Sequence, residues 1–109
     1  MGRYDGRLYV LTTTMPGADQ AEQLAAVLVE RGLAVCAQVS AGMTSCYRWR
    51  GRTEYAQEVG MVLKVRDDRL GDCLEFLRAE HPYEVPQLTA WPVALVDEAY
   101  GRWAWGEDA

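Results

Sequence analysis

The stretch from Glu80 to Pro86, with the sequence EHPYEVP, restricts the fold of this chain more than any other. An amphipathic run leads into it, and an extended apolar run follows it. Pro82 cannot continue a helix, because proline has no backbone N–H and its ring clashes with the preceding turn. The stretch therefore predicts a corner where the chain turns from helix to strand. It also holds the only histidine, His81, so it is the first place to look for chemistry.

Three segments have the spacing of helices. Residues 19–31 repeat apolar side chains at i, i+3, i+4, i+7 and i+8, and residues 70–77 form a second such face. Asp67 and Asp68 suit the N-cap of this second helix, because their carboxylates can accept from free N–H groups. Residues 97–105 place aromatic side chains at helical spacing and predict a short terminal helix.

Strands are predicted where β-branched and aromatic residues alternate without breakers. The second strand is interrupted by a glycine at position 42, which indicates a bulge or bend, and Gly51 marks a hairpin turn. Pro92 places the last strand at a sheet edge, because proline cannot donate to a central ladder. The predicted strands are residues 8–14, 33–39 continuing as 44–50, 58–65 and 88–93.

The resulting order is β-α-β-β-α-β with a C-terminal helix. Two right-handed βαβ halves of this kind give an α+β, ferredoxin-like split βαβ sandwich, in which helices cover one face of an antiparallel sheet. The length of 109 residues suits one domain. We expect residues 1–6 to be a flexible tail and residues 7–109 to be the single domain.

The composition excludes several partners. The net charge of −5 argues against nucleic acid, which requires a basic surface. No apolar run approaches the roughly 20 residues of a membrane span, and the N-terminus does not have the pattern of a signal peptide. The number and spacing of the three cysteines do not suggest a disulfide framework, and three free thiols suit a reducing cytoplasm. We therefore expect a cytoplasmic protein with neither nucleic-acid nor membrane partners.

The sequence offers few catalytic candidates. It contains neither a nucleophile elbow nor a phosphate-binding glycine loop, so we expect no enzymatic activity. His81 could ligate a metal, but a histidine favoured by the negative end of a helix is the commoner reading. Cys36 and Cys73 lie in apolar positions, where a buried thiol is an inert hydrophobe.

The predicted hairpin carries two aromatic side chains, Tyr47 and Trp49, on one face and two arginines, Arg48 and Arg50, on the other. Together with Arg52, these arginines can face Glu54 and Glu58 across the hairpin. A hairpin tip has little core of its own. The aromatic pair therefore belongs either to a local cluster or to a contact with another chain.

The chain resembles the CutA divalent-cation-tolerance family. The ordered set Ser45-x-Tyr47-x-Trp49-x-Gly51 followed by His81-Pro82-Tyr83 carries most of this resemblance. Further matching positions are Leu33-Ala34, Cys36, Gly42, Thr44, Glu58, Leu63-Lys64, Val85-Pro86, Pro92-Val93, Tyr100 and Trp103.

The resemblance implies a homotrimer in which the long hairpins pair between subunits and close exposed sheet edges. It assigns Tyr47, Trp49, Arg48 and Arg50 to the trimer interface. It also implies clefts between subunits near the His-Pro-Tyr corner, and Tyr83 and Lys64 are the cleft residues that we expect.

The resemblance further implies tolerance of divalent ions and, in some members, copper binding. The ligands proposed for the family are a cysteine at the end of strand one and a His-His pair, which correspond here to Thr13, Glu80 and His81. Two of these are not the soft ligands that copper prefers, so we expect weak binding of copper or another divalent cation. The alternative is a non-enzymatic trimeric signalling or binding module, whose clefts take a small anionic metabolite or a partner protein.

Overall fold

A four-stranded antiparallel sheet with the order β2-β3-β1-β4 forms the centre of the computed structural model, which describes residues 7–107. This is the predicted ferredoxin-like α+β arrangement, with β3 inserted between β1 and β2. The predicted tail, residues 1–6, lies outside the described residues. The strands are β1 (Leu8–Met15), β2 (Cys36–Trp49), β3 (Arg52–Arg66) and β4 (Thr89–Pro92).

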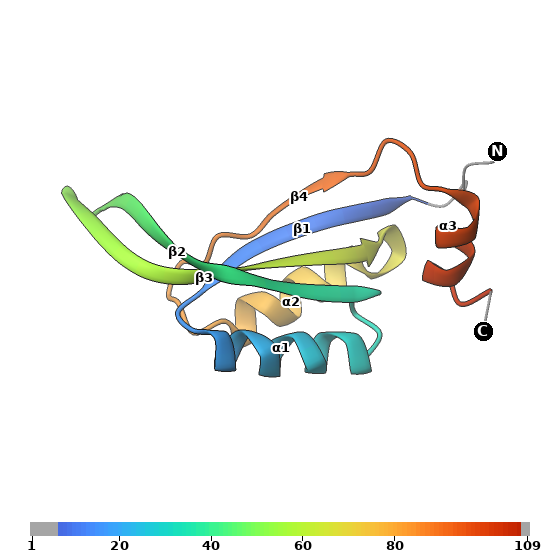
Figure 1. Ribbon diagram of the computed structural model, residues 1–109, viewed down its shortest axis with the longest axis horizontal. Helices are drawn as coiled ribbons and strands as arrows, with labels where there is room; N and C mark the ends of the chain where they lie inside the picture. The colour runs from blue at the N-terminus through green and yellow to red at the C-terminus, as the bar shows by residue number, and fades with distance from the viewer. Residues whose placement is uncertain (1–6, 108–109) are drawn as a thin grey trace.

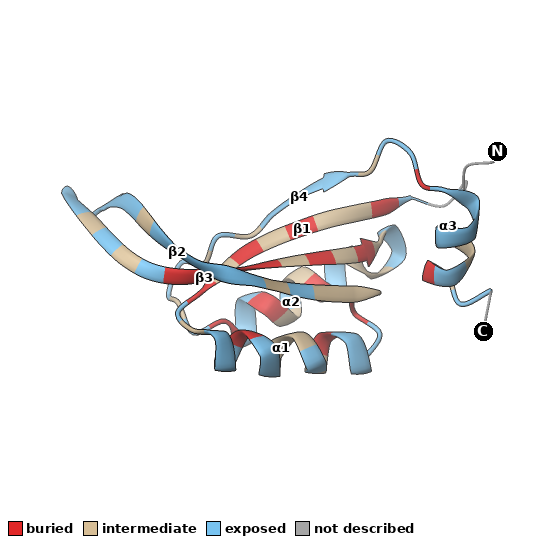
Figure 2. Cartoon of the chain, viewed as in Figure 1, coloured by how far each residue is buried: buried red, intermediate tan, exposed pale blue. Residues whose placement is uncertain are grey.

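Two helices, α1 (Ala18–Glu30) and α2 (Leu70–Glu80), cover one face of the sheet, and the short α3 (Glu98–Ala104) lies at one end of the molecule (Figure 1). The largest cluster of buried residues lies on β1, β3, α1 and α2 and the segment after α1, and Figure 2 shows buried positions on these elements. This core includes Leu11, Leu28, Leu33, Met61, Leu63, Val65, Cys73 and Leu77. Within residues 7–107, no helix has the length and apolar character needed to cross a membrane.

The β2–β3 hairpin projects beyond this core (Figure 1), and the chain measures 49 Å along its longest axis but 25 and 24 Å along the others. Arg50 and Gly51 form its turn with φ of 51° and 78°. Two consecutive positive φ values are typical of the tight turn whose twist matches that of paired strands. The pairing register shifts between Val39 and Gly42, which confirms the predicted irregularity.

β4 lies at the edge of the sheet, as Pro92 predicted. It pairs only with β1, from Thr12 opposite Thr89 to Tyr9 opposite Pro92. β2 forms the other edge. Within the described chain, the outer sides of both strands therefore present backbone groups that no further strand covers.

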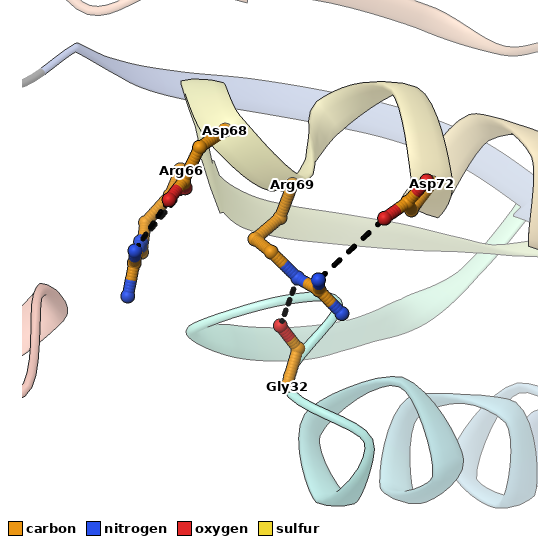
Figure 3. Close-up of polar contacts among 5 residues, drawn as sticks. All are labelled: Gly32, Arg66, Asp68, Arg69 and Asp72. Carbon is orange, nitrogen blue, oxygen red and sulfur yellow. Dashed lines mark hydrogen bonds and ion pairs between the residues drawn. The ribbon is translucent and has the colours of Figure 1, made fainter.

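The acidic cap predicted for α2 was wrong. Arg66 holds Asp68 through two hydrogen bonds of 2.9 and 2.6 Å, so this carboxylate is directed away from the helix (Figure 3). A 3-10 turn, η1 (Asp67–Arg69), precedes α2, and the N-cap residue Arg69 makes no side-chain capping bond. Arg69 instead donates to the carbonyl of Gly32 at 3.1 Å and pairs with Asp72 at 3.5 Å, which ties α2 to the end of α1 (Figure 3).

Candidate functional site

His81 is the C-cap of α2, and its side chain is buried against the end of β1 (7% exposed). Its backbone is already extended, as the proline that follows requires. Its Nε2 lies 2.9 Å from the Thr14 carbonyl oxygen and 3.1 Å from Thr13 Oγ1. Its Nδ1 accepts from the backbone N–H of Tyr83 at 3.1 Å. Both ring nitrogens therefore have partners.

These contacts determine which nitrogen of the His81 ring carries the proton. Nδ1 must keep its lone pair to accept from Tyr83, so Nε2 carries the proton and donates to Thr14. Burial lowers the pKa of His81, and this outweighs the raising effects of the Thr14 carbonyl and of Glu58. The imidazole is thus neutral at pH 7. The interpretation of a charged histidine favoured by the helix dipole was wrong, because the ring turns into the protein.

Glu58 of β3 is a buried carboxylate (8% exposed) that the Tyr83 hydroxyl contacts across 2.6 Å. Burial acts to raise the pKa of Glu58. Hydrogen bonds from Ser45, Tyr83 and Thr14, together with the nearby His81, outweigh burial and hold that pKa below its ordinary value. Burial and the carboxylate in turn raise the pKa of Tyr83. The site therefore holds one fixed negative charge on Glu58.

The pairing predicted between Glu58 and the hairpin arginines was wrong. The Cα partner of Glu58 on β2 is Met43, well before the arginines. Arg50 instead lies 3.6 Å from Glu84, a residue of the segment that joins α2 to β4. The sequence placed Glu58 on the third predicted strand, but it did not indicate that the Tyr83 hydroxyl contacts this carboxylate.

A groove of about 710 Å³ opens where the hairpin leaves the body and the segment 83–87 passes from α2 to β4. Tyr47 and Trp49 line it with 45% and 38% of their surfaces exposed, and Tyr83 and the buried Glu58 line it as well. The other lining residues are Thr14, Ser45, Cys46, Ala56, Glu84, Val85, Pro86 and Gln87.

The structure brings only one of the two expected cleft residues to this groove. Tyr83 lines it, whereas Lys64 donates to Gln38 at 3.0 Å and is not among the lining residues. Arg48 and Arg50 are exposed near the hairpin turn, and neither lines the groove.

The three residues expected to hold a metal differ in their surroundings. Thr13 and His81 are buried together, whereas Glu80 is exposed at the end of α2. Within residues 7–107, no group of three or more His, Cys, Asp or Glu side chains could hold an ion. A hydroxyl, an exposed carboxylate and an imidazole with both nitrogens engaged are poor ligands for copper. Ligation by His81 would first have to break one of its hydrogen bonds.

The cysteines are free and separate. Cys73 is buried as predicted, and burial raises its pKa to about 11, so it is an inert thiol at neutral pH. Cys36 is only half-buried, with its Sγ 3.8 Å from the Tyr100 hydroxyl. Cys46 is exposed and lines the groove.

Comparison of the sequence and the structure with known proteins identifies the family of this chain. The family model of the CutA1 divalent ion tolerance protein matches residues 9–107. The chain belongs to this family. The divalent-cation tolerance protein CutA of Escherichia coli is 38% identical over 94 residues, which cover 86% of this chain and 84% of that protein.

A second CutA relative, the protein CutA homolog of Xenopus laevis, is 35% identical over 98 residues. The match covers 90% of this chain but 65% of the Xenopus protein, so this chain spans less than two thirds of that relative. The solved structure of CutA from Synechococcus elongatus superimposes with a TM-score of 0.89 at 30% identity and covers 99% of this chain and 95% of that one.

Proposed function

We propose that this CutA-family protein is a non-enzymatic, cytoplasmic homotrimer that contributes to tolerance of divalent metal ions. The family match over residues 9–107 carries this proposal. The Escherichia coli relative, similar over most of both chains, is named for divalent-cation tolerance. Three free thiols support a reducing compartment.

The trimer is supported by surface that one chain leaves uncovered. Tyr47 and Trp49 are large, exposed aromatic residues on a hairpin with no core of its own, and Tyr55 on β3 is 71% exposed. Aromatic side chains and arginine are the residues enriched at protein interfaces. Arg48 and Arg50 beside them suit the polar rim of such a contact. Strand pairing between copies would also cover the two open sheet edges.

Copper binding is proposed to be weak and to use the His81 imidazole with oxygen from Glu80 and Thr13. Neither oxygen donor is a soft ligand, and the imidazole must give up a hydrogen bond to bind. Tolerance in this protein therefore does not depend on a tight copper site.

Copper titration by calorimetry tests this proposal. Wild type and His81→Ala are compared in a Cys46→Ser background, because the exposed thiol of Cys46 can bind copper by itself. We expect affinity weaker than micromolar, with the residual binding lost in His81→Ala. Nanomolar affinity, or equal affinity in both variants, would exclude this assignment.

The alternative of a small anionic metabolite in an intersubunit cleft is less favoured by the charges of the groove. Its charged lining residues are Glu58 and Glu84. Their field repels anions and attracts cations. A protein partner at the same surface stays a prediction.

A further inference from the structure

We infer that a second groove, between α1 and α2, binds a small zwitterion with a carboxylate and an ammonium at opposite ends of an apolar chain. The carboxylate of this ligand would pair with Arg31, and its ammonium with Glu80. The inference goes beyond the proposed function, because it concerns an organic ligand and uses neither His81 nor Thr13.

The α1–α2 groove encloses about 400 Å³, which lies within the range of roughly 300–1,000 Å³ typical of small-molecule sites. The two helices that form it cover one face of the sheet (Figure 1). No residue of the β2–β3 hairpin or of the edge strand β4 is among its lining residues. The groove therefore does not use the surface that we assign to the contact between copies of the chain.

The floor of the α1–α2 groove is apolar. Leu24 and Val27 of α1 and Phe76 of α2 are half-buried there, and the buried Met15 and the exposed Pro82 complete this surface. Leu24 and Val27 share one side of α1, because residues three or four apart are neighbours on a helix. An alkyl chain that lies on this floor would be removed from water, which favours binding.

Arg31 supplies a positive charge to the groove. Its guanidinium lies 5.1 Å from the centre of the Phe76 ring, so the side chain is directed over the apolar floor. The ion pairs among residues 7–107 do not include Arg31, and its N–H donors are available to a ligand. Arginine binds carboxylates through two parallel hydrogen bonds, which makes a carboxylate the partner of choice.

Glu80 supplies a negative charge to the same groove. It follows Phe76 by four residues, which is about 6 Å along the axis of α2. It is exposed, and within the described part of the chain it is not paired with Arg31 or any other cation. A ligand with only one charge would leave either Arg31 or Glu80 without a partner. A zwitterion matches both charges, and an apolar chain between its ends matches the floor.

The test is a titration of the full-length protein with 6-aminohexanoate, followed by NMR chemical shifts of backbone amides. Hexanoate and hexylamine serve as ligands that carry only the carboxylate or only the ammonium. A metal chelator in the buffer makes the result independent of the metal ions of the proposed function. We expect saturable shifts in α1 and α2, with millimolar affinity for 6-aminohexanoate and binding at least about threefold weaker for the other two compounds. No saturable shift in these helices, or equal affinity for the three compounds, would overturn the inference.

Variants then locate the two charges. We expect Arg31→Gln to weaken binding of 6-aminohexanoate and hexanoate by about three- to fivefold and to leave hexylamine unaffected. Glu80→Gln should weaken 6-aminohexanoate and hexylamine instead. Arg78→Gln and Glu75→Gln are the matched controls, because both residues are exposed on α2 and neither lines the groove. A loss in the control variants equal to that in Arg31→Gln and Glu80→Gln would contradict the proposed location.

Discussion

Replacement of Tyr83 by Phe removes a single hydroxyl from the contact that joins the corner after α2 to β3. This hydroxyl donates to Glu58 Oε2 across 2.6 Å, a length typical of hydrogen bonds to charged acceptors. Phe keeps the aromatic ring, whose centre lies 5.1 Å from that of His81. The substitution therefore changes the hydrogen bond and leaves the packing in place.

The expected loss follows from the donors that remain. Hydrogen bonds to charged groups contribute about 1.5–3 kcal/mol to stability. Ser45 and Thr14 would still help to keep the pKa of Glu58 low, so we expect the free energy of unfolding to fall by about 1.5–2 kcal/mol at pH 7.

The loss of stability caused by Tyr83→Phe should become smaller at low pH. The pKa of Glu58 is lower in the folded chain than its ordinary value. The stabilisation is therefore complete above the ordinary glutamate pKa of about 4.3 and is lost as the pH falls through the lowered folded value. The difference between wild type and Tyr83→Phe should narrow below about pH 4.

Urea unfolding followed by circular dichroism at pH 7 and near pH 3.5 measures the loss in free energy of unfolding and its dependence on pH. Chain concentration is held fixed, because the stability of an oligomer depends on it. Tyr55→Phe is the control, since Tyr55 is 71% exposed, and its change should stay within about 0.5 kcal/mol. A Tyr83→Phe loss no larger than that of the control, or the same loss at both pH values, would refute the reasoning.

Three further predictions test the surroundings of the site. His81→Ala should lower the free energy of unfolding by about 2–4 kcal/mol in denaturant titrations, because both partners of a buried ring are left unpaired. The folded pKa of His81 is lowered, so its stabilisation is complete above about pH 6.5 and is lost as the pH falls toward the folded value. Below that pH, the melting temperature of wild type should therefore fall more steeply with decreasing pH than the melting temperature of His81→Ala. Gly60→Ala should cost about 1–3 kcal/mol, because the new Cβ would lie 2.8 Å from Ser40 Oγ and 3.0 Å from Met43 Cε. Gly17→Ala, with no atom within 4 Å of its Cβ, should shift the unfolding midpoint little, and similar shifts for the two glycine variants would contradict this steric argument.

Most of the fold could be predicted because the signals were local. Periods of two and of three to four residues separated strands from helices, and Pro82 and Pro92 marked the corner and the edge strand. Gly51 marked the hairpin turn, but the positive φ of Arg50 had no sequence signal, because arginine rarely adopts it.

The site was harder to predict because its contacts join distant segments. The sequence predicted that Glu58 faces the hairpin arginines. Its partner is instead Tyr83, which lies 25 residues away and reaches Glu58 only after the chain turns at Pro82. His81 was placed in the last helical turn, but the same turn directs its ring toward β1. The one sequence signal for Glu58 was its place among the positions that match the family pattern.

Multi-angle light scattering at micromolar concentration tests the central claim, that this chain works as a CutA-family trimer, most directly. The exposed hairpin aromatics and open sheet edges predict a single species with three times the mass of one chain. A homogeneous monomer at that concentration would contradict the assembly and, with it, the assignment of Tyr47 and Trp49 to an interface.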